Sequence, residues 1–420
     1  MKRGFYTIMA AQFFSSLADN ALLIAAIALL IELQAPDWMK PLLKLFFTIS
    51  YVLLAPFVGP FADSMPKGKV MFITNAIKVF GCGLMFFSVH PLLAYAVVGL
   101  GAAAYSPAKY GILTELLPPE KLVAANGWIE GTTVGSIILG TVLGGLLISP
   151  KISSALLSFD MPVLETGIDT PAESAIIVIA GVYALAAMFN LRIPQTGAHY
   201  PRQERNPFKL VLEFGHCLTT LWRDKLGQIS LAVTTLFWGA GATLQFIVLE
   251  WAKVQLGMPL SKAAILQGVV AIGVAIGAVV AAKFIPLIGS LRVLPFGVAM
   301  GVLVPFMTLV SDVTVAYPIL VLVGGMAGFF VVPMNALLQH RGHVLMSAGH
   351  SIAVQNFNEN LMVLIMLGLY ALLIRSQWHI NSVITLFGVF VALTMLLVIR
   401  KHRANQKVFD SVATIGHIPH

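Results

Sequence analysis

The stretch LLAYAVVGLGAAAYSPAKYGILT, residues 92–114, decides the fold class. It contains a single charged residue, Lys109, among mostly apolar neighbours. A helix that crosses a lipid bilayer needs about 20 mostly apolar residues, and this run is long enough. The stretch therefore predicts a membrane-spanning helix, and the rest of the chain can be tested for others like it.

The composition of the whole chain agrees with a membrane protein. Of its 420 residues, 58% are hydrophobic and only 10% are charged, and the mean hydropathy is +0.89. A soluble domain carries about 25% charged residues. The net charge of +8 is spread over short loops and chain ends, without the clustered stripe that nucleic acid requires, so we expect no nucleic-acid partner.

The two cysteines predict neither a disulfide nor a metal site. Cys82 falls in an apolar span and Cys217 in what we interpret as a basic loop, and their spacing fits no metal motif. We expect no metal and no cofactor.

Eleven further apolar runs accompany the first, which predicts twelve spans. The twelve spans lie at 5–33, 42–62, 70–89, 92–114, 122–148, 174–191, 228–251, 263–287, 292–310, 315–338, 347–374 and 380–399. The predicted fold is an all-α membrane protein with twelve transmembrane helices in two six-helix halves. The predicted divisions are an N-terminal half at 1–191, a cytoplasmic linker at 192–227, a C-terminal half at 228–400 and a cytoplasmic tail at 401–420.

The distribution of Lys and Arg predicts the orientation. With the N-terminus inside, six basic residues face out: Lys40, Lys44, Lys151, Lys253, Lys262 and Arg375. Apart from Lys78 and Lys109 within spans, the remaining eighteen face the cytoplasm, as the positive-inside rule requires. The acidic loop at 149–173 fits the outer face. We expect an uncleaved first span and both termini in the cytoplasm.

An offset of 226 residues aligns the two halves. It pairs Gly99 with Gly325, Pro107 with Pro333, Lys109 with Asn335, Asp19 with Gln245 and Glu130 with Asn356. Polar residues thus meet polar residues inside apolar spans, as a duplicated six-helix unit predicts. Parallel six-span repeats are the architecture of the major facilitator superfamily.

Five charged residues lie at membrane depth, where each costs about 2.5–3.5 kcal/mol on insertion scales. They are Asp19, Lys78, Lys109, Glu130 and Glu359. Both signs of charge in one bundle favour a zwitterionic or anionic head group as cargo. For four of them a structural role stays open: Lys109 can snorkel to the interface, Lys78 can pair with an acid, and Glu130 and Glu359 can be struts between helices. Asp19 is too short to snorkel from its depth.

Several separated motifs carry a resemblance to a known family. They are AAAYSPAKYGIL at 102–113, ADNALL at 18–23, FWGAG at 237–241, GFFVVPMNALLQHRG at 328–342 and IAVQN at 352–356. The chain resembles the bacterial lysophospholipid transporters of the LplT family, in the major facilitator superfamily, over nearly its whole length.

The resemblance implies a transporter, not an enzyme, in the bacterial inner membrane. It implies movement of lysophosphatidylethanolamine, and also lysophosphatidylglycerol, from the outer to the inner leaflet without ATP. It also implies a cytoplasmic acyltransferase/acyl-ACP synthetase as functional partner, which restores the missing acyl chain. No G-x-x-x-x-G-K-[ST] phosphate loop is present in the sequence.

The resemblance and the intramembrane pattern together give the candidate residues. The resemblance implies that Asp19, Lys109 and Glu130 take part in transport. The full set of candidate substrate-binding residues is Asp19, Asn20, Tyr105, Lys109, Asn126, Glu130, Gln245, Asn335, Asn356 and Glu359. The candidate gating or structural residues are Asp63, Lys78, Pro107 and Pro333. We expect Lys109 to face a phosphate, Asp19 or Glu130 to face an ammonium in a cleft between the halves, and the acyl tail to stay among membrane lipids.

The chain departs from the expected pattern at two places. Gln245 stands where the family carries Arg, which removes a basic phosphate ligand there. The loop after the second span, GPFADSMPKGK at 59–69, lacks the Arg that follows the Asp of the superfamily motif, so the partner of Asp63 is not given by the motif.

Two other functions would also place charged residues inside a membrane protein. An intramembrane lipid enzyme would carry H-x-x-x-x-D, H-E-x-x-H or D-G-x-x-A-R, and the sequence has none of them. We interpret its close histidine pair, His340 and His343, as part of a solvated cytoplasmic loop. A proton-coupled drug or metabolite antiporter, with Asp19 and Glu130 carrying protons, stays open.

Overall fold

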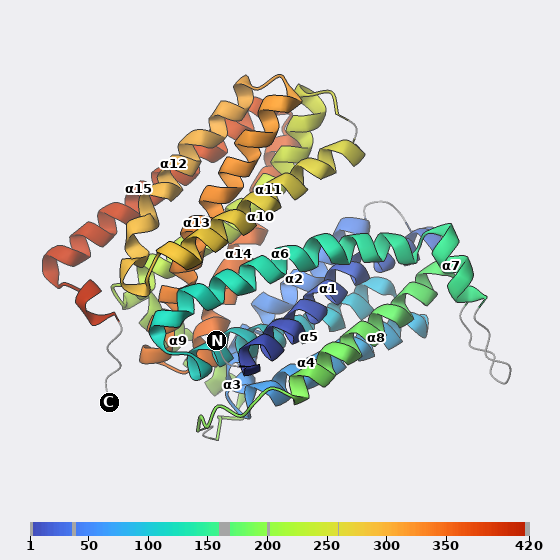
Figure 1. Ribbon diagram of the computed structural model, residues 1–420, viewed down its shortest axis with the longest axis horizontal. Helices are drawn as coiled ribbons and strands as arrows, with labels where there is room; N and C mark the ends of the chain where they lie inside the picture. The colour runs from blue at the N-terminus through green and yellow to red at the C-terminus, as the bar shows by residue number, and fades with distance from the viewer. Residues whose placement is uncertain (1–2, 36–38, 159–168, 200–201, 259, 416–420) are drawn as a thin grey trace. The chain divides into compact units, whose positions relative to one another are not determined.

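The computed structural model describes residues 3–35, 39–158, 169–199, 202–258 and 260–415, and these residues form helices and no strands (Figure 1). Eleven helices are long and apolar enough to cross a membrane, or twelve when a bent pair counts as one span. The predicted all-α membrane fold is confirmed. The acidic residues Asp160 and Glu165 of the predicted outer loop lie outside the described residues.

The helices follow the predicted spans closely. The first group is α1 (Arg3–Glu32), α2 (Met39–Leu53), α3 (Ala55–Ala62), α4 (Lys67–Phe86), α5 (Pro91–Leu116), α6 (Leu122–Leu147) and α8 (Pro171–Leu191). The second is α10 (Gly227–Gln255), α11 (Leu260–Phe284), η2 (Leu287–Val293), α12 (Leu294–Leu303), η3 (Val304–Leu309), α13 (Val313–Leu345), α14 (Ala348–Arg375) and α15 (Ile380–Val408). Shorter helices are η1 (Pro119–Lys121), α7 (Pro150–Leu157), α9 (Pro207–Arg223) and η4 (Val412–Thr414).

The chain packs into two compact units. Unit 1 comprises residues 1–116 and 135–211, and unit 2 comprises residues 117–134 and 212–420. The first part of α6 thus packs with unit 2, and the first part of the linker with unit 1. The boundaries predicted for the two halves stay a prediction.

The helices pair in the same way within each unit. In unit 1, α1 packs on α8, α4 on both α5 and α8, and α2 on α5. In unit 2, the equivalent spans give α10 on α15, α12 on both α13 and α15, and α11 on α13. The α11–α13 contact is close enough that a Cβ on Gly277 would overlap the carbonyl oxygen of Gly325. Small residues allow such approach between membrane helices.

Prolines explain where two predicted spans are broken. The second span bends by 67° between α2 and α3, where Pro56 stands in the first turn of α3 and lacks an N–H to continue the ladder. The ninth span is a short α-helix between two 3₁₀ segments, with Pro295 and Pro305 at their junctions. Pro107 and Pro333, by contrast, lie inside continuous helices.

The linker contains a helix that the sequence analysis did not predict. In α9 the residues Leu210, Phe214, Cys217 and Leu221 recur at helical spacing and are buried. The interpretation of Cys217 as a loop residue is therefore wrong. It lies on the inward face of an amphipathic helix, and Phe208 and Leu212 on another face are exposed.

Candidate functional site

A buried ion pair forms the centre of unit 1. The Lys78 ammonium on α4 donates to both carboxylate oxygens of Asp19 on α1, at 2.8 and 2.9 Å. Its third donor reaches the hydroxyl of Ser15 at 3.0 Å, so its three N–H groups all have acceptors. The Lys78 side chain is only 1% exposed, whereas that of Asp19 is 23% exposed. The carboxylate is therefore the part of the pair that a ligand can reach.

Polar neighbours hold the pair in one geometry. Ser15 donates to Asn75 Oδ1 at 2.8 Å, which ties one turn of α1 to the turn of α4 that precedes Lys78. Tyr183 on α8 donates its hydroxyl to Asp19 Oδ1 at 2.7 Å. Among the described residues nothing accepts a hydrogen bond from the buried Asn75 amide nitrogen. Residues of α1, α4 and α8 thus fix the carboxylate.

Two aromatic rings and a glycine make room for the cation. The ammonium of Lys78 lies 5.0 Å from the ring centroid of Tyr105 and 5.3 Å from that of Tyr183, within the range of cation–π attraction. A Cβ on Gly101 of α5 would stand 2.8 Å from Cγ of Lys78, so only glycine leaves space for the lysine stem. The aromatic and small residues of α5 and α8 therefore build the Lys78 pocket.

A second buried charge network lies at the end of α3. Lys67, at the start of α4, pairs with Asp63 and contacts Glu115 of α5 at 3.5 Å. Its ammonium also donates to the carbonyl of Ala62 at 2.8 Å. Glu115 in turn accepts from the hydroxyl of Thr196 at 2.8 Å. Lys67 thus takes the place of the Arg that the superfamily loop motif would supply to Asp63.

Unit 2 holds a buried polar cluster of two amides and one carboxylate on α13 and α14. The Gln355 amide on α14 donates to Asn335 on α13 at 3.0 Å and to Glu359, one turn further, at 2.7 Å. Asn335, Gln355 and Glu359 are all buried. This cluster brings together two of the predicted residues from different spans.

The other predicted residues of unit 2 are placed separately. Asn126 and Gln339 exchange two amide hydrogen bonds of 2.9 Å, which join α6 to α13. Asn356 is buried on α14, and Gln245 is exposed on α10. The side chain of Glu130 lies outside the described residues.

The remaining predicted residues of unit 1 lie apart from the pair. Asn20 turns its amide back to the carbonyl of Ser16 at 2.8 Å, one turn earlier on α1. The ammonium of Lys109 lies 4.2 Å from the ring centroid of Tyr110. The roles of Asn20 and Lys109 as substrate ligands stay predictions.

Sequence reasoning missed four polar partners and misplaced one histidine. The missed partners are Ser15, Tyr183, Gln339 and Gln355. Ser15 and Gln355 each stand four residues before a candidate acid, and that spacing is a usable signal. The interpretation of His340 as part of a solvated loop is wrong, since it is 2% exposed inside α13.

Comparison with known proteins agrees with this architecture. The profile of the Major Facilitator Superfamily matches residues 8–366. Among solved structures, a bacterial homologue of the iron transporter ferroportin has a TM-score of 0.72 at 15% identity and covers 97% of this chain and 100% of its own. The human organic anion transporter MFSD10 has a TM-score of 0.72 at 14% identity, with 95% and 100% covered. At such identities the likeness shows the fold alone.

Curated relatives are much closer in sequence. The lysophospholipid transporters LplT of Yersinia enterocolitica and Yersinia pestis (strain Pestoides F) are each 42% identical over 376 residues, which is 89% of this chain and 88% of theirs. The chain belongs to the Major Facilitator Superfamily of membrane transporters and, within it, to the LplT family.

Proposed function

We propose that this protein moves lysophosphatidylethanolamine, and also lysophosphatidylglycerol, from the outer to the inner leaflet of a bacterial inner membrane. Its relatives are named lysophospholipid transporters, which supports lysophospholipid as the substrate class. The two termini lie in the cytoplasm. Transport proceeds by alternating access without ATP, and a cytoplasmic acyltransferase/acyl-ACP synthetase then re-acylates the product.

The main structural support for this proposal is the ion pair of Asp19 and Lys78, in which the carboxylate is partly exposed and the ammonium is buried. A charged group at membrane depth is costly and is kept there for function in most membrane proteins. Lys78 is fully buried and has all its donors engaged, so it supports the carboxylate and does not offer itself to cargo. Asp19 keeps 23% of its side chain exposed. A carboxylate held in this way is suited to receive a cation such as the ammonium of ethanolamine.

The head group is the part of a lysolipid that needs a protein. Moving a polar head group without hydrogen-bond partners into hydrocarbon costs several kcal/mol of free energy. The single acyl tail is apolar and has no such cost. In the proposed path Asp19 receives the ammonium. Lys109 supplies the positive charge for the phosphate. The tail stays among membrane lipids throughout.

Leaflet-resolved transport of lysolipids that differ only in head group tests the proposal. Proteoliposomes are given fluorescent lysophosphatidylethanolamine, lysophosphatidylglycerol or lysophosphatidylcholine, and the label that albumin can no longer extract is measured over time. We expect the first two to cross at rates well above those in protein-free liposomes. Equal rates with and without protein for every head group would overturn the proposed substrate class.

A charge-neutral double variant separates function from folding. Asp19→Asn with Lys78→Met removes both charges and leaves no buried ion unpaired. We expect this variant to purify as a folded protein that no longer transports lysophosphatidylethanolamine. Wild-type transport by the double variant would show that the pair is only a strut. Repeating the wild-type assay with and without a proton gradient tests the antiporter alternative, which requires a gradient-dependent rate.

A further inference from the structure

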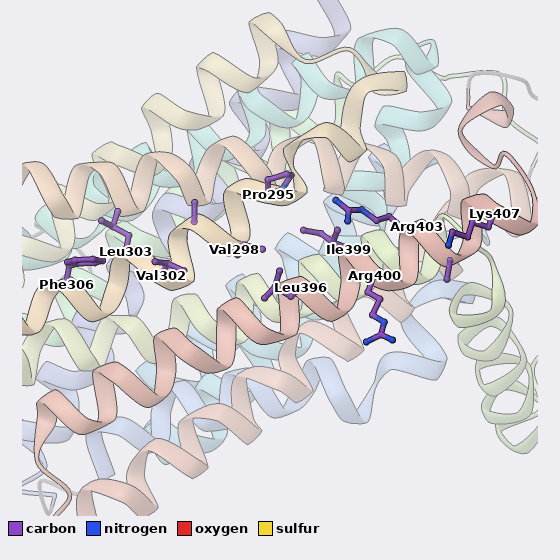
Figure 2. A pocket seen from close by; sticks show the side chains of 12 residues that line it. Pro295, Val298, Val302, Leu303, Phe306, Leu396, Ile399, Arg400, Arg403 and Lys407 are labelled. Atoms are coloured by element: carbon purple, nitrogen blue, oxygen red, sulfur yellow. The ribbon is translucent and has the colours of Figure 1, made fainter.

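A groove in unit 2 lies between α12 with η3 and α15, and the residues that line it are not among those of the candidate site. It has a volume of about 1020 Å³. Figure 2 shows Phe306 and Leu303 at one end of it and Lys407 at the other, so the groove runs along the helices.

Most of the groove is apolar and open. Its wall includes Val298, Val302, Leu303 and Phe306 on one side and Leu396 and Ile399 on the other. Val302 and Phe306 are each about half exposed. The stretch from Pro295 to Phe306 spans roughly 17–20 Å at the rise of α- and 3₁₀-helices. An extended hydrocarbon chain fits such a surface.

Small residues contribute to the shape of the groove. Gly301 of α12 packs against the backbone of α15 at Ala392. A Cβ at position 301 would stand only 2.5 Å from the Ala392 nitrogen. Ala299 and Ala404 then line the groove without filling it.

Three cations close one end of the groove. Arg400, Arg403 and Lys407 recur at positions i, i+3 and i+7 and therefore share one face of α15. All three are exposed, no acidic residue lines the groove, and no carboxylate in the described part of the chain forms a salt bridge with them. By the positive-inside rule this end of α15 lies on the cytoplasmic side.

We propose that this groove binds a two-chain anionic phospholipid of the cytoplasmic leaflet, with its phosphate at Arg400, Arg403 and Lys407 and an acyl chain along α12. Arginine forms paired, charge-assisted hydrogen bonds with phosphate oxygens. Basic pockets between transmembrane helices on the cytoplasmic side are typical sites for anionic lipid head groups. A zwitterionic lipid is disfavoured, because its ammonium would meet three cations that no acid offsets. The bound lipid is a resident of the fold and not the cargo.

The affinity for defined lipids tests the proposal. The full chain is purified in detergent, and its melting midpoint is followed by tryptophan fluorescence while lipid is added. We expect dioleoyl phosphatidylglycerol to raise the midpoint in a saturable way, and dioleoyl phosphatidylethanolamine and inorganic phosphate to leave it unchanged. A rise with lysophosphatidylglycerol but not with the two-chain lipid would overturn the proposal in favour of a cargo site.

Matched variants locate the effect. Arg400→Gln with Arg403→Gln should weaken the apparent affinity for phosphatidylglycerol at least tenfold. The control, Lys401→Gln with Arg292→Gln, removes the same charge from exposed positions outside the groove lining and should change it less than twofold. Equal losses in both pairs would mean that only net charge matters, which overturns a specific site.

A third variant tests the apolar part without changing charge. Ala299→Trp fills the groove from an exposed position, and it should also abolish the rise caused by phosphatidylglycerol. An unchanged rise would contradict the placement of the acyl chain. Loss of lysolipid transport by the Arg400 and Arg403 double variant in bilayers without anionic lipid would place the groove on the transport path and refute a resident lipid.

Discussion

Removing one partner of the Asp19–Lys78 pair should destabilise the protein by different amounts, depending on which partner is removed. Asp19→Asn leaves an ammonium that is 1% exposed without a counter-charge, and breaking a buried pair in this way costs about 3–5 kcal/mol. Lys78→Met leaves a carboxylate that is 23% exposed and still accepts from Tyr183. Water and this hydrogen bond offset part of the loss, so about 1–3 kcal/mol is expected.

The double variant should recover much of the stability. With Asp19→Asn and Lys78→Met together, no charge remains to be solvated, and replacing a buried pair by neutral groups is often nearly neutral. The single losses sum to about 4–8 kcal/mol, so a double variant that loses only about 1 kcal/mol implies a pairwise coupling of about 3–7 kcal/mol. The free energy of unfolding is measured by titration with sodium dodecyl sulfate in micelles, with tryptophan fluorescence as the signal.

The control is a lysine on the same helix. Lys69→Met changes an exposed side chain of α4 and should shift the free energy of unfolding by no more than about 0.5 kcal/mol. The reasoning is refuted if the two single losses simply add, with coupling below about 0.5 kcal/mol. It is also refuted if Lys78→Met costs more than Asp19→Asn.

Three further substitutions can be measured with the same unfolding titration. Lys67→Met removes the ammonium that pairs with the buried carboxylates of Asp63 and Glu115, and it should lower the free energy of unfolding by about 3–5 kcal/mol. A decrease under about 1 kcal/mol contradicts a structural role for that network. Gly277→Ala forces α11 away from the backbone of α13 and should cost about 1–3 kcal/mol, whereas Gly268→Ala on the same helix, with open space at its Cβ, should be nearly neutral. Gln339→Leu removes the donor to the buried Asn126 Oδ1, while the Asn126 nitrogen keeps its bond to the Leu122 carbonyl. The change should cost about 1–3 kcal/mol, most of it regained when Asn126 is also changed to Leu.

The spans were predictable because each is a long apolar run, and length and polarity alone identify such a run. The breaks in the second and ninth spans were not predicted, although Pro56 and Pro305 were visible in the sequence. A proline such as Pro107 can also lie inside a continuous helix. Helix α9 was not predicted because it lies in a polar stretch of the chain, and its buried apolar residues recur only at helical spacing among polar residues such as Lys209 and Glu213.

The partners within the site were harder to predict than its members. Asp19 is an evident candidate from its depth, but two lysines lie in the spans of the same unit, and composition does not say which one faces it. The rotation of α4 and α5 about their axes decides in favour of Lys78, which is 59 residues from Asp19 in the chain. Tyr183 gives no signal at all, because an aromatic residue in an apolar span is expected whatever it touches.

The cancellation of charge between Asp19 and Lys78 has an electrical consequence. Moving one elementary charge across a membrane potential of 100 mV changes the free energy by about 2.3 kcal/mol. Since the two residues are held within 2.9 Å of each other, a rearrangement that carries both of them through the field does no net electrical work. On this account the voltage dependence of uptake reports the valence of the cargo: a zwitterionic lysolipid crosses at the same rate in energised and de-energised vesicles, and an anionic one does not.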